Sequence, residues 1–140
     1  MSFGNTMINL NEQVYSDSTP EKIQSVDLDV LADLGDGQQI GEPDFVVELI
    51  DLYLNQTPIL LNSIRSGLAE NDWISVKRMA HNLRGSSNSL GILQMGEFAS
   101  DVEYLSTPDE VEIMSLLRQL EDEFAQVEKI LLAERQRRTS

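Results

Sequence analysis

The chain has 140 residues, of which 41% are hydrophobic and 24% charged, and it carries a formal net charge of −14 with no cysteine. This length predicts one domain with a single core. The absence of cysteine excludes disulfides, thiolate nucleophiles and cysteine-ligated zinc, and a single histidine gives no reason to expect a transition-metal site. The acidic balance argues against nucleic acid and anionic lipid as partners, and no apolar run approaches the roughly 20 residues of a membrane span.

The charge is unevenly distributed along the chain. Residues 1–72 hold thirteen acids and two bases, residues 106–140 hold eight acids and five bases, and residues 73–105 hold three of each. The only histidine, His81, lies in this neutral stretch with Lys77, Arg78 and Arg84 around it. Such an island on an acidic protein is a candidate anchor for an anionic group, although three bases in eight residues also occur on ordinary solvated helix faces.

Residues 1–25 are rich in Asn, Ser, Thr, Gln and Asp and show no sustained periodicity. They are interpreted as a flexible N-terminal tail, followed by one folded domain over residues 26–136. Because the tail has neither a positive cluster nor a continuous apolar core, it does not read as a signal peptide, and a cytoplasmic location is expected. The apolar residues of segment 26–34 predict a short helix that ends at Gly35-Asp36-Gly37. Residues 26–30 also alternate between apolar and acidic side chains, as in a strand.

A long helix is predicted from Pro43 and Asp44 to about Gly67. Its apolar positions are Phe45, Leu49, Leu52, Ile59 and Leu68, with Val46, Ile50 and Tyr53 beside them. Pro58 lies inside this pattern and should kink the helix or divide it in two, because proline removes a backbone hydrogen bond.

Three further helices are predicted after Asn71 or Asp72, either of which can act as a cap. The first has apolar positions spaced 3, 4, 3, 4 and 3, which is typical of a bundle seam, at Trp73, Val76, Ala80, Leu83, Ser87 and Leu90. The second carries Leu93, Phe98, Val102 and Leu105, and the third carries Val111, Met114, Leu117, Leu120, Phe124, Val127, Ile130 and Leu131. With short connections and no convincing strand, we predict an all-α, antiparallel up-and-down four-helix bundle with a short extra N-terminal helix.

The segment around His81 is the most informative for chemistry, because the chain has no glycine-rich nucleotide-binding loop and no HExxH motif. Gly85 and the serines and asparagine after it have low helix propensity, which together makes a helix here less favourable by on the order of 3 kcal/mol than alanine would. The helix could end at Arg84, but Ser87 and Leu90 keep the seam in phase. We therefore predict a continuous helix with a bare patch one turn from the imidazole, where another backbone or a bulky tetrahedral group can approach.

The segment Ala80-His81-Asn82-Leu83-Arg84-Gly85-Ser86-Ser87, followed by Leu90-Gly91, closely resembles the signature of histidine phosphotransfer (HPt) domains, commonly written AHxLKGSS…LG. These domains are the intermediates of multistep His–Asp phosphorelays. The resemblance extends over roughly residues 26–130 and leaves the tail outside.

The resemblance implies roles for four residues. His81 would carry the phosphoryl group, its exposed Nε2 attacking the phosphoaspartate of a receiver domain. Arg84 stands where the family usually has lysine, so its charge is expected to serve the same role with a different geometry. Gly85 would leave room over the ring. Glu103 would accept a hydrogen bond from the other ring nitrogen. The alternative interpretation is that Glu103 is an ordinary surface carboxylate.

The resemblance also implies partners, namely response-regulator receiver domains and hybrid sensor histidine kinases. Lys77, Arg78 and Asn88 are predicted to contribute to docking, whereas Ser86 and Ser87 are expected to be small packing residues. The chain is expected to be a monomeric phosphoryl carrier rather than an enzyme, with no cofactor of its own and with Mg²⁺ supplied by the receiver. Two alternatives stay open: a non-phosphorylated helical adaptor that binds receivers, and a phosphoacceptor for a separate chemotaxis-type kinase.

Overall fold

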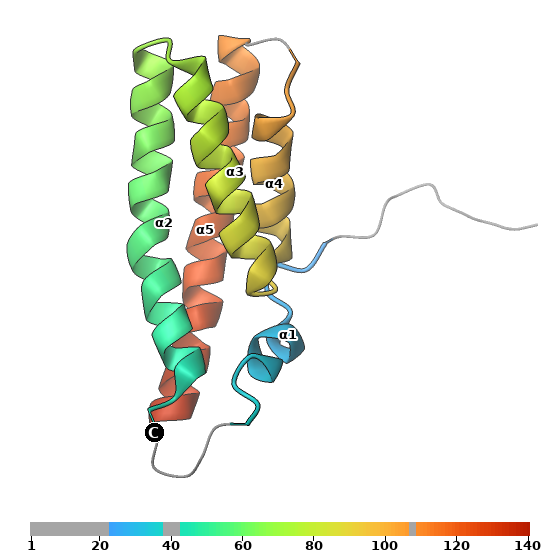
Figure 1. The fold of residues 1–140 in the computed structure, drawn as a ribbon, viewed down its shortest axis with the longest axis vertical. Coiled ribbons are helices and arrows are strands. Elements are labelled where there is room, and N and C mark those ends of the chain that lie inside the picture. Colours follow the sequence, from blue (N-terminus) through green and yellow to red (C-terminus); the bar gives the residue numbers. More distant parts are fainter. Residues whose placement is uncertain (1–22, 38–42, 107–108) are drawn as a thin grey trace, which may run out of the picture.

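The computed structural model describes residues 23–37, 43–106 and 109–140. These residues form five helices: α1 (Leu28–Asp33), α2 (Phe45–Ala69), α3 (Trp73–Ser89), α4 (Leu93–Glu103) and α5 (Glu110–Thr139). The four longer helices pack side by side in the cyclic order α2, α3, α4, α5 (Figure 1). The predicted all-α up-and-down bundle is confirmed, and no strand occurs in the described part of the chain. Nearly all of the predicted tail, residues 1–22, lies outside the described residues.

The core runs along the middle of the bundle, and α3 contributes the seam that its spacing predicts. Val76, Ala80, Leu83 and Ser87 are buried, while Trp73 and Leu90 at the two ends are half-buried. Ser87 is the polar member of this seam, and its hydroxyl lies 2.8 Å from the Tyr53 hydroxyl of α2 in a buried hydrogen bond. Burial raises the pKa of Tyr53 to about 12. The hydrogen bond therefore joins two neutral hydroxyls and aligns α2 with α3.

Helix α2 buries a different stripe from the one that its main apolar spacing suggests. In α2, Leu52 is 52% exposed and Ile59 is 65% exposed. The buried positions of α2 are instead Val46, Ile50, Tyr53, Thr57, Leu61, Ile64 and Gly67. Helix α4 buries Met95, Gly96, Ala99 and Val102, of which only Val102 belongs to its predicted apolar set. Helix α5 leaves Val111 exposed but buries four of its predicted positions, Leu117, Leu120, Val127 and Leu131. Because apolar side chains surround more than half of α2, the packing of α3 and α5 decides which of them are covered.

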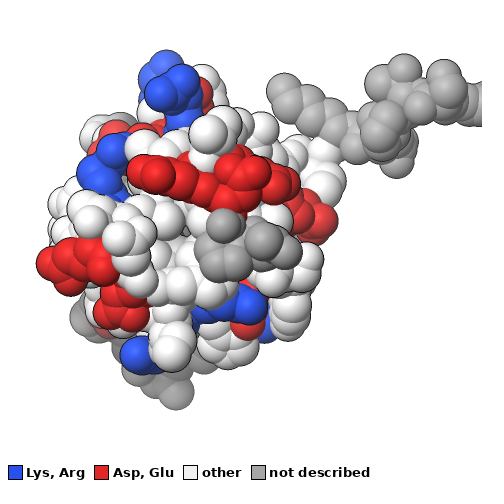
Figure 2. Space-filling view, turned by 90° about the horizontal axis from the view of Figure 1, so that it is seen from above, with Lys and Arg blue, Asp and Glu red and all other residues white. Residues whose placement is uncertain are grey.

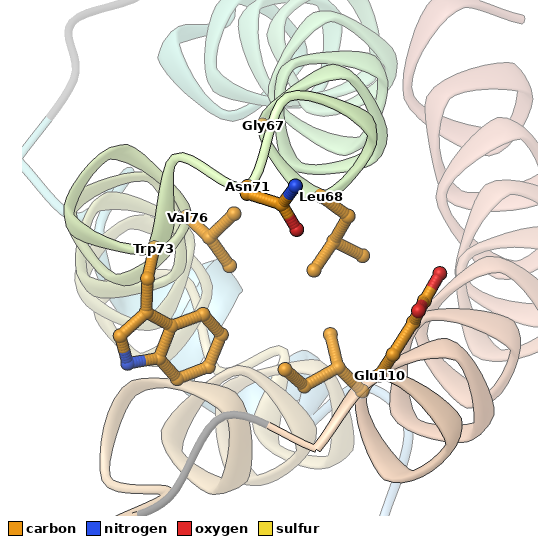
Figure 3. A pocket seen from close by; sticks show the side chains of 7 residues that line it. Gly67, Leu68, Asn71, Trp73, Val76 and Glu110 are labelled. Atoms are coloured by element: carbon orange, nitrogen blue, oxygen red, sulfur yellow. The ribbon is translucent and has the colours of Figure 1, made fainter.

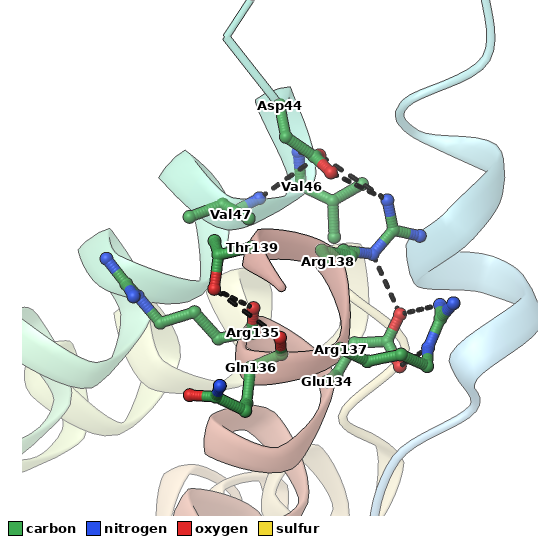
Figure 4. A network of polar contacts seen from close by, with 9 residues as sticks. All are labelled: Asp44, Val46, Val47, Glu134, Arg135, Gln136, Arg137, Arg138 and Thr139. Carbon is green, nitrogen blue, oxygen red and sulfur yellow. Dashed lines mark hydrogen bonds and ion pairs between the residues drawn. The ribbon is translucent and has the colours of Figure 1, made fainter.

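Helix α2 is not divided at Pro58, since one helix continues through this residue from Phe45 to Ala69. Its N-cap is Asp44, whose carboxylate accepts hydrogen bonds from two backbone N–H groups of the first turn. Arg138, near the end of α5, donates to Asp44 at 3.1 Å and to Glu134 at 2.7 Å. Figure 4 shows this network, which joins the C-terminal end of α5 to the beginning of α2.

The turn between α3 and α4 is held by α1, which confirms the predicted short helix. Gly91 has φ +76, and a Cβ there would lie 2.9 Å from both the Asp27 carbonyl oxygen and the Val30 Cβ, so only glycine fits. The Asp27 N–H donates to the Gly91 carbonyl at 2.7 Å, and Leu31 is the buried residue of α1. The predicted helix stop at Gly91 therefore sets the direction in which α4 returns.

The opposite end of the bundle contains the α2–α3 turn and the start of α5. An apolar cavity of about 260 Å³ opens there, and Figure 3 shows Leu68, Asn71 and Trp73 around it. Seen from this end, acidic side chains form separate clusters with basic groups at the rim (Figure 2). Within the described ranges, no helix is long and apolar enough to span a bilayer.

Candidate functional site

His81 lies midway along α3, which continues unbroken through Gly85 to Ser89 as predicted. Ala80 and Leu83 on either side of it are fully buried and fix the rotation of the helix. His81 therefore projects from the flank of the bundle, and its side chain is 59% exposed. The imidazole is supported by the bundle but remains open to solvent.

The orientation of the imidazole is set by Glu103, the last residue of α4. The Nδ1 atom of His81 lies 2.6 Å from Glu103 Oε2. Burial raises the pKa of the Glu103 carboxyl, but hydrogen bonds from Arg84 and His81 outweigh burial and hold this pKa below its usual value. Since Glu103 is ionised, it accepts the hydrogen bond and Nδ1 carries the proton. In the neutral ring the lone pair is then on Nε2, the nitrogen that faces away from Glu103.

Arg84 completes this group from the next turn of α3. Its Nε–H donates to Glu103 Oε1 at 2.7 Å, so the Glu103 carboxylate binds the imidazole with one oxygen and the guanidinium with the other. This hydrogen bond raises the pKa of Arg84. A carboxylate at the end of a helix lies near the negative end of the helix dipole, and the two donors from α3 offset that cost.

Gly85 lies one turn after His81 on the exposed side of α3. A Cβ built on Gly85 would meet nothing within 4 Å. Packing within the chain therefore gives no reason for glycine at this position, although glycine costs about 1 kcal/mol relative to alanine inside a helix. The free space beside the ring is available to a molecule that approaches from outside.

The three predicted docking residues occupy different places around His81. Lys77 precedes it by about one turn, with its Nζ atom 5.9 Å from the Trp73 ring centroid, and Arg78 is exposed beside it. Asn88 is also exposed but lies against α4, since a Cβ on Gly96 would come within 2.0 Å of the Asn88 Oδ1. The structure therefore brings Arg84, Gly85 and Glu103 to the imidazole, with Lys77 one turn before it and Asn88 nearly two turns after it.

An apolar groove between α2 and α3 is a feature that the sequence analysis missed. Its volume is about 180 Å³, and its walls include Leu49, Leu52 and Leu60 from α2 and Ser86 and Ser89 from α3. Ser86, which lines it, is the neighbour of Gly85 in the chain. The available signal was the second apolar stripe of α2, which the sequence analysis assigned to the main helical pattern.

This arrangement can present one nucleophilic nitrogen, with its tautomer fixed and a cation beside it, on an open surface. The described residues contain no cluster of three or more His, Asp or Glu side chains that could hold a metal ion. An exposed nucleophilic nitrogen beside a cation can take up an anionic group.

Comparison with known proteins gives the family. The family model described as "Hpt domain" matches residues 48–130, more than half of the chain, and this range includes His81, Arg84, Gly85 and Glu103. The chain belongs to the Hpt domain family. Hpt domains are phosphoryl carriers of phosphorelays, rather than nucleotide-binding enzymes, and they act with hybrid histidine kinases and receiver domains.

Solved Hpt structures have the same fold. The histidine-containing phosphotransfer protein B of Pseudomonas aeruginosa is 24% identical with a TM-score of 0.70, covering 83% of this chain and 98% of its own. The Hpt domain of a Shewanella sensor hybrid histidine kinase is 18% identical with a TM-score of 0.64, covering 80% of this chain and 94% of its own. No curated protein matches the sequence.

Proposed function

We propose that this Hpt domain accepts a phosphoryl group on Nε2 of His81 from the aspartate of one receiver domain and passes it to another receiver. The observation that carries the proposal is the 2.6 Å contact between Nδ1 and Glu103, because it leaves the lone pair on the solvent-facing nitrogen. Imidazole suits this step, because its unprotonated nitrogen is a nucleophile that can carry a phosphoryl group.

In the transfer step, the Nε2–P bond forms while the P–O bond of the acyl phosphate breaks, and the receiver's aspartate leaves as a carboxylate. Nδ1 keeps its proton, so the phosphorylated ring carries a positive charge beside the negative charge of Glu103. Onward transfer is the same exchange in reverse on another aspartate. Mg²⁺ and the acidic pocket would come from the receiver, and His81, Arg84 and Gly85 would meet them.

The receiver would dock across Gly85 and the apolar groove between α2 and α3. Leu52 and Ile59 present apolar surface beside this face, and exposed apolar patches of this kind mark protein contact sites. The basic residues near His81 favour the approach of an acidic pocket, which the otherwise acidic chain would repel. Lys77 and Arg78 would act through this charge, and Asn88 would lie at the rim.

His81→Gln is the direct test of the phosphoacceptor. A purified receiver, first phosphorylated by its hybrid kinase with radiolabelled ATP, is mixed with the wild-type chain or the variant. Label should move to the wild type and not to His81→Gln, while circular dichroism stays unchanged because the side chain is exposed. Equal labelling of the variant would reject His81 as the acceptor.

Gly85→Gln tests the open space beside the ring. Because no described side chain, apart from its two chain neighbours, lies within 4 Å of a Cβ at this position, the variant should keep its fold. It should nevertheless slow transfer from the receiver at least tenfold by obstructing the partner's backbone. An unchanged transfer rate would show that docking does not pass over Gly85.

The two alternatives make different predictions for the same assay. A non-phosphorylated adaptor would bind the receiver but would take up no label. A phosphoacceptor for a separate kinase would be labelled directly by that kinase with ATP, without a receiver. The label on His81 should be lost in acid and stable in base, which distinguishes phosphohistidine from phosphoserine.

A further inference from the structure

Tyr104, the residue after Glu103, is not accounted for by the proposed transfer chemistry. It is the C-cap of α4, and the residue is 66% exposed, so burial does not explain its position. The guanidinium carbon of Arg84 lies 5.7 Å from its ring centroid. An arginine over an aromatic face at this distance makes a cation–π contact.

The guanidinium of Arg84 is thereby held by two contacts. Its Nε donates to Glu103 at 2.7 Å and its central carbon lies over the Tyr104 ring, while its terminal Nη2 lies 3.1 Å from His81 Nδ1. Because Nδ1 already carries the proton that it donates to Glu103, it cannot also accept from Nη2, and two donors face each other. The donors of Nη2 are therefore available to an acceptor close to the ring.

We infer that Tyr104 is a positioning residue, which holds the Arg84 guanidinium so that Nε stays on Glu103 while the terminal nitrogens bind the phosphoryl oxygens on His81. This inference rests on the proposed function, because it names how the cation of the same site is aimed. A lysine at this position would have one ammonium group for both tasks, whereas a guanidinium divides them between separate nitrogens. Arg84, which replaces the lysine of the HPt signature, would thus bind Glu103 and the phosphoryl group at the same time.

The test compares Tyr104→Leu with Tyr104→Phe in two backgrounds, the wild-type chain and Arg84→Ala. The full chain is incubated with potassium phosphoramidate, which needs no partner protein: the Nε2–P bond forms, the N–P bond of the reagent breaks and ammonia leaves. Uptake of phosphate on His81 is followed by ³¹P NMR. Tyr104→Leu should slow uptake roughly two- to fivefold, the range of an exposed cation–π contact. Tyr104→Phe should restore the wild-type rate, because it keeps the ring.

The Arg84→Ala background separates positioning from a general effect on the fold. There, Tyr104→Leu should have no further effect, since the group on which it acts is gone. In ¹H–¹⁵N spectra the Arg84 Nε–H signal should also lose its ring-current shift in Tyr104→Leu and keep it in Tyr104→Phe.

Two results would overturn the inference while the proposed function stands. One is normal uptake by Tyr104→Leu, and the other is an equal loss in both backgrounds. If the wild-type chain takes up no phosphate on His81, the proposed function fails, and the inference fails with it.

Discussion

At the scale of single residues, one carboxylate organises the site. Glu103 accepts a hydrogen bond from the imidazole with one oxygen and from the guanidinium with the other, so the two reactive groups of α3 depend on one residue of α4. A group that acts through two partners at once should have effects larger than those of a single hydrogen bond. The proposed ring tautomer and the proposed phosphoryl contact therefore change together when Glu103 changes.

Glu103→Gln is predicted to slow phosphoryl uptake about tenfold, because it weakens two charge-assisted hydrogen bonds while it keeps an amide oxygen for Nδ1. Uptake from phosphoramidate measures the effect. Glu97→Gln is the matched control, since Glu97 is an exposed carboxylate of the same helix. Loss of activity in both variants would assign the effect to charge in general, and loss in neither would make Glu103 an ordinary surface carboxylate.

At the scale of helices, α2 and α3 approach closely near their connecting turn. A Cβ on Gly67 would lie 2.8 Å from Cγ2 of Val76, which is fully buried and β-branched and so has little freedom to move. The Tyr53–Ser87 hydrogen bond joins the same two helices farther along. Close packing thus explains the glycine in α2, whereas the glycine in α3 is one that we propose to serve an external partner.

Gly67→Ala and Gly85→Ala should change stability in opposite directions. The first should destabilise the domain by about 1 kcal/mol, because the clash with Val76 exceeds the gain in helix propensity. The second should stabilise it by up to about 1 kcal/mol, because the new methyl group enters open space within a helix. Urea denaturation measures both values, and a loss of stability in Gly85→Ala would contradict the assignment of this glycine to a partner.

At the scale of the whole molecule, the chain is strongly acidic, and ionic contacts join the C-terminal end of α5 to the beginning of α2. Hydrogen bonds from Arg137 lower the pKa of Glu134. Burial opposes this effect, but a further hydrogen bond from Arg138 adds to it. Burial raises the pKa of Asp44, but Arg138 and the backbone N–H groups lower it overall. Because these pKa values are lower in the folded state, their stabilisation is complete above the unfolded values and is lost as pH falls through the folded values.

Thermal unfolding should therefore shift to lower temperature as pH falls below about 4, the ordinary range of these carboxyl groups. Glu134→Gln should lower the free energy of unfolding by about 1 kcal/mol near pH 7. Between about pH 4 and about pH 2 the variant should lose less stability than the wild type does. Comparison of wild type and variant at each pH cancels the change in net charge that both share. Parallel curves for the two proteins would show that this network does not contribute to acid sensitivity.

The sequence determined the helical class, the unbroken α3 and the position of its seam, because the spacing from Trp73 to Leu90 and the stop at Gly91 are local properties. It also placed His81 at the edge of the core for the same reason. The contact of Glu103 with His81 was predicted through the family resemblance, and nothing local to either residue specifies it, because they are 22 residues apart.

Only the tertiary structure decided which stripe of α2 is buried, and hence that Leu52 and Ile59 lie exposed along the grooves that α2 forms with α3. The same holds for Arg84, which meets Glu103 and the Tyr104 ring only because α4 returns against α3. A helical period tells which residues share a face, but the neighbouring helices decide which face becomes core and which side chains meet across it.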